Sequence, residues 1–179
     1  RWQGAGVECE NKSRRGIRNN RYGAVGPQAG GEVRRKGREQ AMEAKLVRAH
    51  TERRLKFTVP GPMTIVDTGA DRHYGGDRDG RIRMAFAFAD LLNQEAHALQ
   101  ADGVDIIQFD EPAFNVYMQD AADWGVAAPQ RAAAGLTCTP AAHTRHGSGI
   151  QANVSGKQPP GDPGPPTGAG FPRPGARRH

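Results

Sequence analysis

At 179 residues the chain has the length of one domain. Only 36% of its residues are hydrophobic, and its 24 Gly and 13 Pro limit how much of it can be regular structure. Two cysteines exclude a disulfide framework, and no apolar run approaches the roughly 20 residues of a membrane span. We therefore expect a cytoplasmic protein that makes no membrane contact.

The formal net charge of +6 comes from the N-terminal part of the chain. Residues 1–54 hold fourteen Lys and Arg against six Asp and Glu, so the remaining residues are slightly acidic. A basic segment can bind nucleic acid, but this one contains neither a helix-turn-helix nor a zinc-finger pattern, and few aromatic residues on which bases could stack. We therefore do not expect nucleic acid as a partner.

Both ends of the chain lack apolar periodicity. Residues 1–40 are rich in Arg, Gly, Asn and Gln, and we predict a basic, mostly irregular and disordered arm. A helix is predicted within "REQAMEAKLVRAHTE", residues 38–52, because its apolar residues are loosely spaced for one helix face. Residues 147–179 are predicted to be a disordered tail, since their last 21 residues contain seven Pro and five Gly.

The middle of the chain carries the clearest patterns. Residues 55–59 alternate apolar and polar side chains as a strand does, and Pro60-Gly61-Pro62 ends it. A polar glycine-rich loop, 69–80, leads to a predicted helix over 81–103. Its apolar stripe has three- and four-residue spacing, and Gly103 occupies the position of a C-terminal cap: Ala85, Phe88, Ala89, Leu92, Ala96 and Leu99.

A second strand is predicted directly after Gly103. Its sequence, "VDIIQFDEP", lacks polar alternation and is typical of a strand buried on both faces of a parallel sheet. A weaker helix over 119–135, interrupted by Pro129, and a third strand over 136–142 follow. Strands alternating with helices favour right-handed crossovers and an α/β fold.

Two adjacent carboxylates, Asp110 and Glu111, stand where the second strand ends. In α/β proteins, ligands bind at the carboxyl ends of parallel strands. Successive strand side chains point to opposite faces, so only one of the two can point to the ligand side. The alternative is that one carboxylate caps the next turn and the other is solvated.

The segment "VDIIQFDEPAFNVYMQDAADWGV" resembles the catalytic domain of cobalamin-independent methionine synthases and their shorter archaeal- and bacterial-type relatives. The resemblance extends upstream through "LVRAHTERRLKFTVPGPMTIVDT" and downstream through "RAAAGLTCTPAAH", and so covers roughly residues 45–143. It implies a (β/α)8 TIM barrel, of which residues 41–146 would form a part, about three β/α units.

The resemblance also implies an activity, that of a 5-methyltetrahydropteroyltriglutamate–homocysteine S-methyltransferase. In this family a methyl-folate, or another donor, gives its methyl group to homocysteine, whose thiol is bound and activated by zinc. The residue matching Asp110 contacts the amino group of the substrate, with Glu111 as a supporting residue. The loop Pro60-Gly61-Pro62 matches a family loop that lines the site.

The zinc ligands are where the chain departs from the family. His143 stands at the histidine of a His-x-Cys pair, but Arg145 stands at the cysteine, and arginine offers a metal no lone pair. No glutamate follows Glu111 and no cysteine follows Cys138. Two hypotheses result: an incomplete copy of the methyltransferase, or a non-catalytic remnant or partner-binding module that kept the barrel segment and lost the zinc site.

Overall fold

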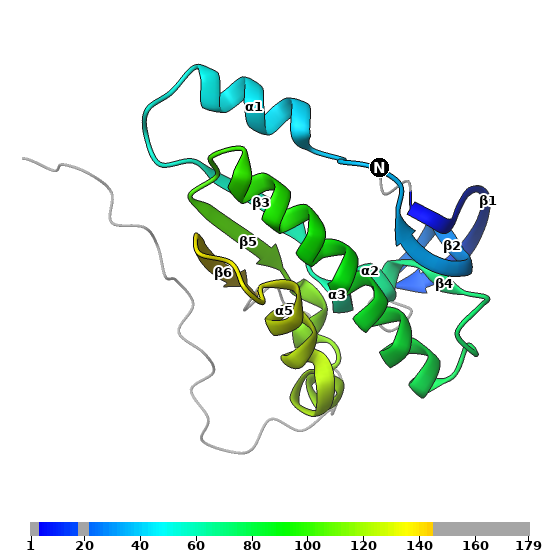
Figure 1. The fold of residues 1–179 in the computed structure, drawn as a ribbon. Helices are drawn as coiled ribbons and strands as arrows, with labels where there is room; N and C mark the ends of the chain where they lie inside the picture. The colour runs from blue at the N-terminus through cyan, green and yellow to red at the C-terminus, as the bar shows by residue number, and fades with distance from the viewer. Residues whose placement is uncertain (1–3, 18–21, 145–179) are drawn as a thin grey trace, which may run out of the picture. The chain divides into compact units, whose positions relative to one another are not determined.

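The computed structural model describes residues 4–17 and 22–144, which contain two small sheets and the helices that accompany them (Figure 1). Residues 4–17 and 22–144 belong to the same unit of the fold. Arg145 and the predicted tail, 147–179, lie outside the described residues. Within the described part, no helix combines the length and the apolar composition that a membrane crossing requires.

The central sheet has three parallel strands in the order β3-β5-β6, with bounds β3 Lys56–Pro60, β5 Ile106–Asp110 and β6 Thr139–His143. All three strands lie within or next to the predicted segments, and the mixed α/β fold with parallel strands is confirmed. Pro140 is tolerated because β6 is an edge strand of this sheet, where a missing N–H donor costs little.

Helical segments connect these strands. Between β3 and β5 the chain forms α2 (Pro62–Thr68) and α3 (Arg78–Ala101), and between β5 and β6 it forms η1 (Pro112–Asn115), α4 (Met118–Asp120), η2 (Ala121–Gly125) and α5 (Ala127–Ala132). The predicted helix over 119–135 is thus divided into short pieces, one of them π-helical. Pro129 lies in the first turn of α5, where a helix needs no N–H donor.

The long helix α3 begins three residues before the predicted start. Asp77 caps it, since its carboxylate accepts a hydrogen bond from the Gly80 backbone N–H at 2.6 Å. The predicted C-terminal cap is confirmed, because Gly103 has a φ of 90°, which glycine adopts without strain.

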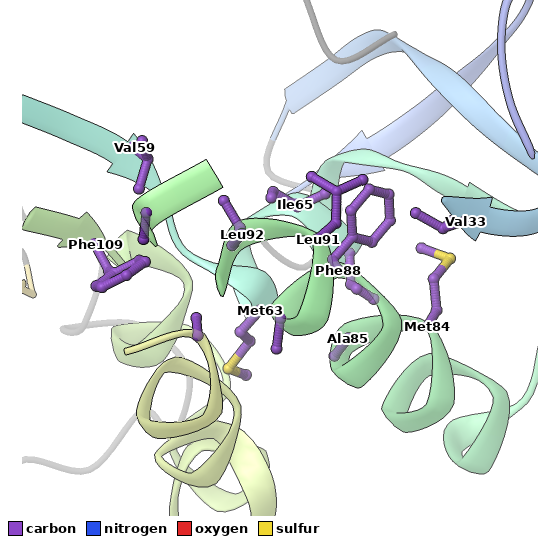
Figure 2. Close-up of a cluster of buried hydrophobic side chains, with 14 of the residues drawn as sticks. Val33, Val59, Met63, Ile65, Met84, Ala85, Phe88, Leu91, Leu92 and Phe109 are labelled. Atoms are coloured by element: carbon purple, nitrogen blue, oxygen red, sulfur yellow. The ribbon is translucent and has the colours of Figure 1, made fainter. Parts of the chain in front are cut away.

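One face of α3 forms the centre of the hydrophobic core. Figure 2 shows Phe88, Leu91 and Leu92 of α3 in a cluster that extends from Val33 of β2 to Phe109 of β5. On β5, the side chains of Ile107 and Phe109 are buried, whereas those of Ile106, Gln108 and Asp110 are half-buried. The prediction of a strand buried on both faces is therefore wrong for the described residues: β5 alternates, and Asp110 lies on the less buried face.

The prediction of an irregular arm over 1–40 is wrong for the described residues 4–17 and 22–35. They form the antiparallel strands β1 (Gly4–Ile17) and β2 (Tyr22–Arg35), and the short strand β4 (Ala70–Asp71) adds to β2 in parallel. Glycine suggested a loop, but here it permits close pairing: a Cβ on Gly6 would lie 2.2 Å from the Glu32 carbonyl oxygen.

Contacts with α3 explain why this basic segment is ordered. Val33 of β2 is buried in the core, and Arg35 pairs with the buried carboxylate of Glu95 on α3. The Gln40 backbone N–H donates to the same carboxylate at 3.1 Å. The helix α1 (Ala41–Ala49) then follows, within the predicted range. Arg35, one of the charged side chains that suggested a disordered arm, thus anchors β2 to α3.

The loop between β4 and α3 is organised by one carboxylate. Asp71 accepts hydrogen bonds from the backbone N–H groups of His73 at 3.0 Å and of Tyr74 and Gly76, both at 2.7 Å. Partial burial alone would raise the pKa of the Asp71 carboxyl, but these three donors together outweigh burial and lower it below its usual value.

This shift predicts a pH dependence of stability. A lowered folded-state pKa stabilises the protein above about pH 4, the usual carboxyl pKa, and this stabilisation is lost as the pH falls through the lower folded-state value. We expect Asp71→Asn to flatten the profile of unfolding free energy measured by urea denaturation between pH 3 and pH 6. The control Asp79→Asn, at an exposed position of α3, should keep the wild-type slope. An unchanged slope in Asp71→Asn would contradict the prediction.

Candidate functional site

The predicted site residues meet at the carboxyl ends of the three parallel strands. In the sheet register Pro60 pairs with Asp110, and Asp110 pairs with His143. Two further hydrogen bonds continue the sheet beyond these residues: Gly61 N–H donates to the Asp110 carbonyl at 2.7 Å, and Glu111 N–H donates to the His143 carbonyl at 2.8 Å. Residues separated by up to 83 positions in the sequence are thus held at one edge.

Of the two adjacent carboxylates at this end of the sheet, that of Asp110 is the partly exposed one. Its side chain is 33% exposed, and its Oδ1 accepts a hydrogen bond from Gln108 Nε2 at 2.7 Å. The Nδ1 of His143 lies 3.1 Å from the same oxygen, and the His143 side chain is 52% exposed. One oxygen is therefore fixed by neighbours while the carboxylate stays accessible, an arrangement suited to pairing with an ammonium group.

Gln108 extends this polar arrangement along β5 to β3. Its Oε1 accepts a hydrogen bond from Lys56 Nζ at 3.0 Å, while its amide nitrogen donates to Asp110. Gln108 and Asp110 are two positions apart on a strand and therefore lie on the same face. The sequence analysis missed Gln108 as a site residue, although its polar side chain within an apolar run was a usable signal.

Glu111 lies on the other side of the strand end and is completely buried. Its Oε1 accepts from the Met63 backbone N–H at 3.0 Å, and its Oε2 accepts from the Thr64 backbone N–H at 2.9 Å and from Thr64 Oγ1 at 2.7 Å. These donors lie in the first turn of α2, where N–H groups have no partner within the helix. Glu111 is thus the cap of α2.

The loop Pro60-Gly61-Pro62 packs closely against the side chain of Glu111. A Cβ on Gly61 would lie only 2.2 Å from Glu111 Cδ, so a side chain at position 61 and the buried carboxylate exclude each other. Gly61 occupies the N-cap position of α2 and offers no side chain to cap it. The sequence analysis did not predict α2, because the start of this helix has no capping residue of its own.

The cysteine of this sheet lies far along β6 from His143. Cys138 directly precedes β6, where its backbone N–H bonds to Gln100 Oε1 at 2.8 Å, whereas His143 is the last residue of the strand. Burial raises the pKa of the Cys138 thiol, and the nearby charge of Asp105 also raises it. Cys138 therefore lies at the amino end of β6, the end opposite the candidate site.

Metal centres in proteins are formed mainly by His, Cys, Asp and Glu side chains. Across residues 4–17 and 22–144, no group of three or more His, Cys, Asp or Glu lies close enough together to hold a metal ion. The His143 ring contacts the carboxylate of Asp110, whereas Glu111 reaches His143 only through its backbone N–H, and Arg145 falls outside the described part. The described residues therefore do not fit a complete zinc site.

Comparisons with known proteins agree on one family. The family model described as "Cobalamin-independent synthase, Catalytic domain" matches residues 20–144. Methionine synthase of Saccharolobus islandicus strain Y.G.57.14 is 36% identical over 93 residues, and that of Sulfolobus acidocaldarius is 32% identical over the same length. Each match covers 52% of this chain and 26% of the relative, so the chain spans about a quarter of these curated proteins.

Among solved structures, a B12-independent methionine synthase from Shewanella sp. W3-18-1, in complex with selenomethionine, is 44% identical with a TM-score of 0.75. The match covers 84% of this chain and 42% of that one. The family match includes the strand ends, the loop 60–62 and all of the candidate site residues described above. The chain therefore belongs to the cobalamin-independent synthase catalytic-domain family.

Proposed function

We propose that the chain acts in methionine synthesis as a homocysteine S-methyltransferase, and that the strand ends at Asp110 and His143 bind the amino group of the amino acid substrate. One observation carries the proposal: a partly exposed carboxylate, fixed on one oxygen, at the carboxyl end of a parallel strand. The names of the similar proteins support methionine synthesis over a partner-binding module without activity.

In this proposal the residues have separate tasks. Asp110 pairs with the substrate ammonium and sets the orientation of the amino acid. Gln108 and His143 hold the Asp110 carboxylate in place, because each contacts its Oδ1. Glu111, which is buried, positions α2 and the loop 60–62 and makes no direct substrate contact.

The proposed scaffold is part of a (β/α)8 barrel. The strands β3, β5 and β6 are parallel and neighbour one another in chain order, with helices in each connection, as consecutive barrel strands do. The site lies at their carboxyl ends, where barrel enzymes bind substrates. A free thiol substrate suits a reducing compartment, and we place the proposed reaction in the cytoplasm.

The proposed cofactors are the zinc and methyl-folate that the family resemblance implies. Zinc, where bound, would lower the pKa of the homocysteine thiol. His143 is the candidate ligand, but the described residues do not complete a zinc site, so we derive no step through the metal. The tasks of Asp110, Gln108, His143 and Glu111 in binding the amino acid are independent of it.

A binding experiment tests the proposal. Isothermal titration of the chain with L-homocysteine and with L-selenomethionine should give saturable binding. Asp110→Asn should weaken it by about 10- to 100-fold, since a charge-assisted hydrogen bond contributes roughly 1.5–3 kcal/mol. The control Asp79→Asn removes the same charge from an exposed position of α3 and should bind as the wild type does. Absence of binding, or equal affinities of the Asp110 variant and the control, would contradict the proposal.

A further inference from the structure

The ammonium group of Lys56 reaches the candidate site through a second side chain. Lys56 is the first residue of β3, and its side chain is exposed. Its Nζ donates a hydrogen bond to Gln108 Oε1 at 3.0 Å, and Gln108 Nε2 donates in turn to Asp110 Oδ1 at 2.7 Å. A lysine on an exposed strand face is ordinarily solvated, but this one is connected to Asp110 through the two ends of a single amide.

The register of the parallel strands explains why these side chains meet. Lys56 and Thr58 are two positions apart on β3 and share a face of the sheet, and Thr58 is the register partner of Gln108. Gln108 and Asp110 share the same face of β5. Because the Lys56 Nζ contacts Gln108, which is one step further along this face, the lysine side chain extends toward the carboxyl ends of the strands.

The two neighbours of Gln108 favour the same orientation of its amide. Lysine offers only donors, and an ionised carboxylate offers only acceptors. If the amide oxygen and nitrogen of Gln108 exchanged places, donors would face the Lys56 ammonium and an acceptor would face the Asp110 carboxylate, so both hydrogen bonds would be lost. Without Lys56 the amide would be held at one end only, and a glutamine side chain loses much rotamer entropy when it is fixed. Lys56 therefore helps to keep Gln108 as a donor to Asp110.

Asp110 depends on Gln108 more than on its other side-chain contact. The Nδ1 of His143 lies 3.1 Å from the same carboxylate oxygen, but it donates only in a form of the ring that carries a hydrogen on Nδ1. The amide nitrogen of Gln108 always has hydrogens to donate, and its contact is the shorter one. The orientation of Gln108 therefore fixes Asp110 Oδ1 whichever form His143 takes.

We propose that Lys56 is a positioning residue of the site at Asp110: it keeps the Gln108 amide turned so that its nitrogen donates to the Asp110 carboxylate. The consequence for an amino acid substrate rests on the function proposed above, whereas the orienting of Gln108 by Lys56 does not. Lys56 itself touches no substrate in this proposal, so its effect on affinity passes entirely through Gln108.

The side-chain amide of Gln108 reports the first step without any ligand. In ¹H–¹⁵N spectra of the full chain, its NH₂ signals are the pair that Gln108→Leu removes. We expect a wide separation of its two proton shifts, because one proton donates to a carboxylate and is drawn downfield. Lys56→Met has a similar length and no donor and should narrow the separation, whereas Lys56→Arg keeps a cationic donor and should restore it. Identical Gln108 signals in the wild type and in Lys56→Met would overturn the proposal.

Isothermal titration with L-selenomethionine tests the second step. Lys56→Met should weaken binding about three- to tenfold, the effect of one ordinary hydrogen bond, and Lys56→Arg should bind within about twofold of the wild type. The control Lys45→Met removes the same charge from an exposed position of α1 and should leave the affinity unchanged. Tighter binding by Lys56→Met would show that the lysine only repels the substrate ammonium, and would overturn the proposal.

A double-mutant cycle separates action through Gln108 from a direct effect of the lysine charge. In the Gln108→Leu background Lys56 has no amide to orient, so adding Lys56→Met should weaken binding no further. Additive losses, or a loss in Lys56→Met no larger than in Lys45→Met, would overturn the proposal. If the wild type does not bind L-selenomethionine, the proposed function fails and the substrate step with it, while the ¹H–¹⁵N comparison still decides whether Lys56 orients Gln108.

Discussion

Glu111→Ala is expected to lower the free energy of unfolding by about 3–5 kcal/mol, because a buried charged acceptor is removed and its donors stay buried. The donors are the backbone N–H groups of Met63 and Thr64 and the Thr64 hydroxyl. Urea denaturation measures the loss. The conservative Glu111→Gln keeps the side-chain volume and one acceptor, so it should cost less than Glu111→Ala.

An exposed glutamate provides the control for this substitution. Glu52→Ala should change the free energy of unfolding by less than about 0.5 kcal/mol, as substitutions at exposed positions usually do. A loss in Glu111→Ala no larger than in Glu52→Ala would show that the buried carboxylate is not the cap that holds α2.

A double-mutant cycle tests the fit between Glu111 and Gly61. Gly61→Ala alone is destabilising, since its Cβ would lie 2.2 Å from Glu111 Cδ. In the Glu111→Ala background that carboxylate is gone, so the same glycine substitution should cost less. The two losses should therefore be non-additive by about 0.5–3 kcal/mol, the range for residues in contact. Additive losses would contradict a direct contact.

Phe109→Ala is expected to cost about 3–5 kcal/mol of unfolding free energy, because it opens a cavity in the core face of β5. The matched variant is Ile106→Ala on the opposite, half-buried face of the same strand. It should cost clearly less, because less apolar area is removed from a packed environment.

The comparison of these two variants tests which face of β5 is packed. Denaturant unfolding of both, at equal protein concentration, gives the two free-energy losses. Comparable losses would show that the face carrying Asp110 is covered as fully as the face carrying Phe109. That result would contradict the accessibility of the Asp110 carboxylate and, with it, the proposed binding of an amino acid substrate.

The sequence was sufficient for the features whose signal is local. The apolar stripe of α3 and the cap at Gly103 follow from spacing and backbone preference, and the three strands of the central sheet follow from short apolar runs between turn residues. The family resemblance was also a sequence-level finding, confirmed by the match over residues 20–144.

Other features needed partners that are distant in the sequence. Residues 22–35 have the composition of a loop, and they form a strand because β1 pairs with them and α3 buries Val33. The helix α2 has no capping residue of its own, and its cap comes from Glu111, about fifty positions later. Local sequence preferences cannot predict either contact, because both depend on how the chain folds back on itself.

The adjacent carboxylates show most clearly which features depend on the sequence alone and which depend on the folded chain. By itself the sequence determined that Asp110 and Glu111 end a strand and that only one of them can face a ligand. The tertiary structure decided which one: sheet register places Asp110 beside His143, and the first turn of α2 encloses Glu111. The reason is physical, since a buried carboxylate needs several donors, and only the folded chain brings the N–H groups of α2 to Glu111.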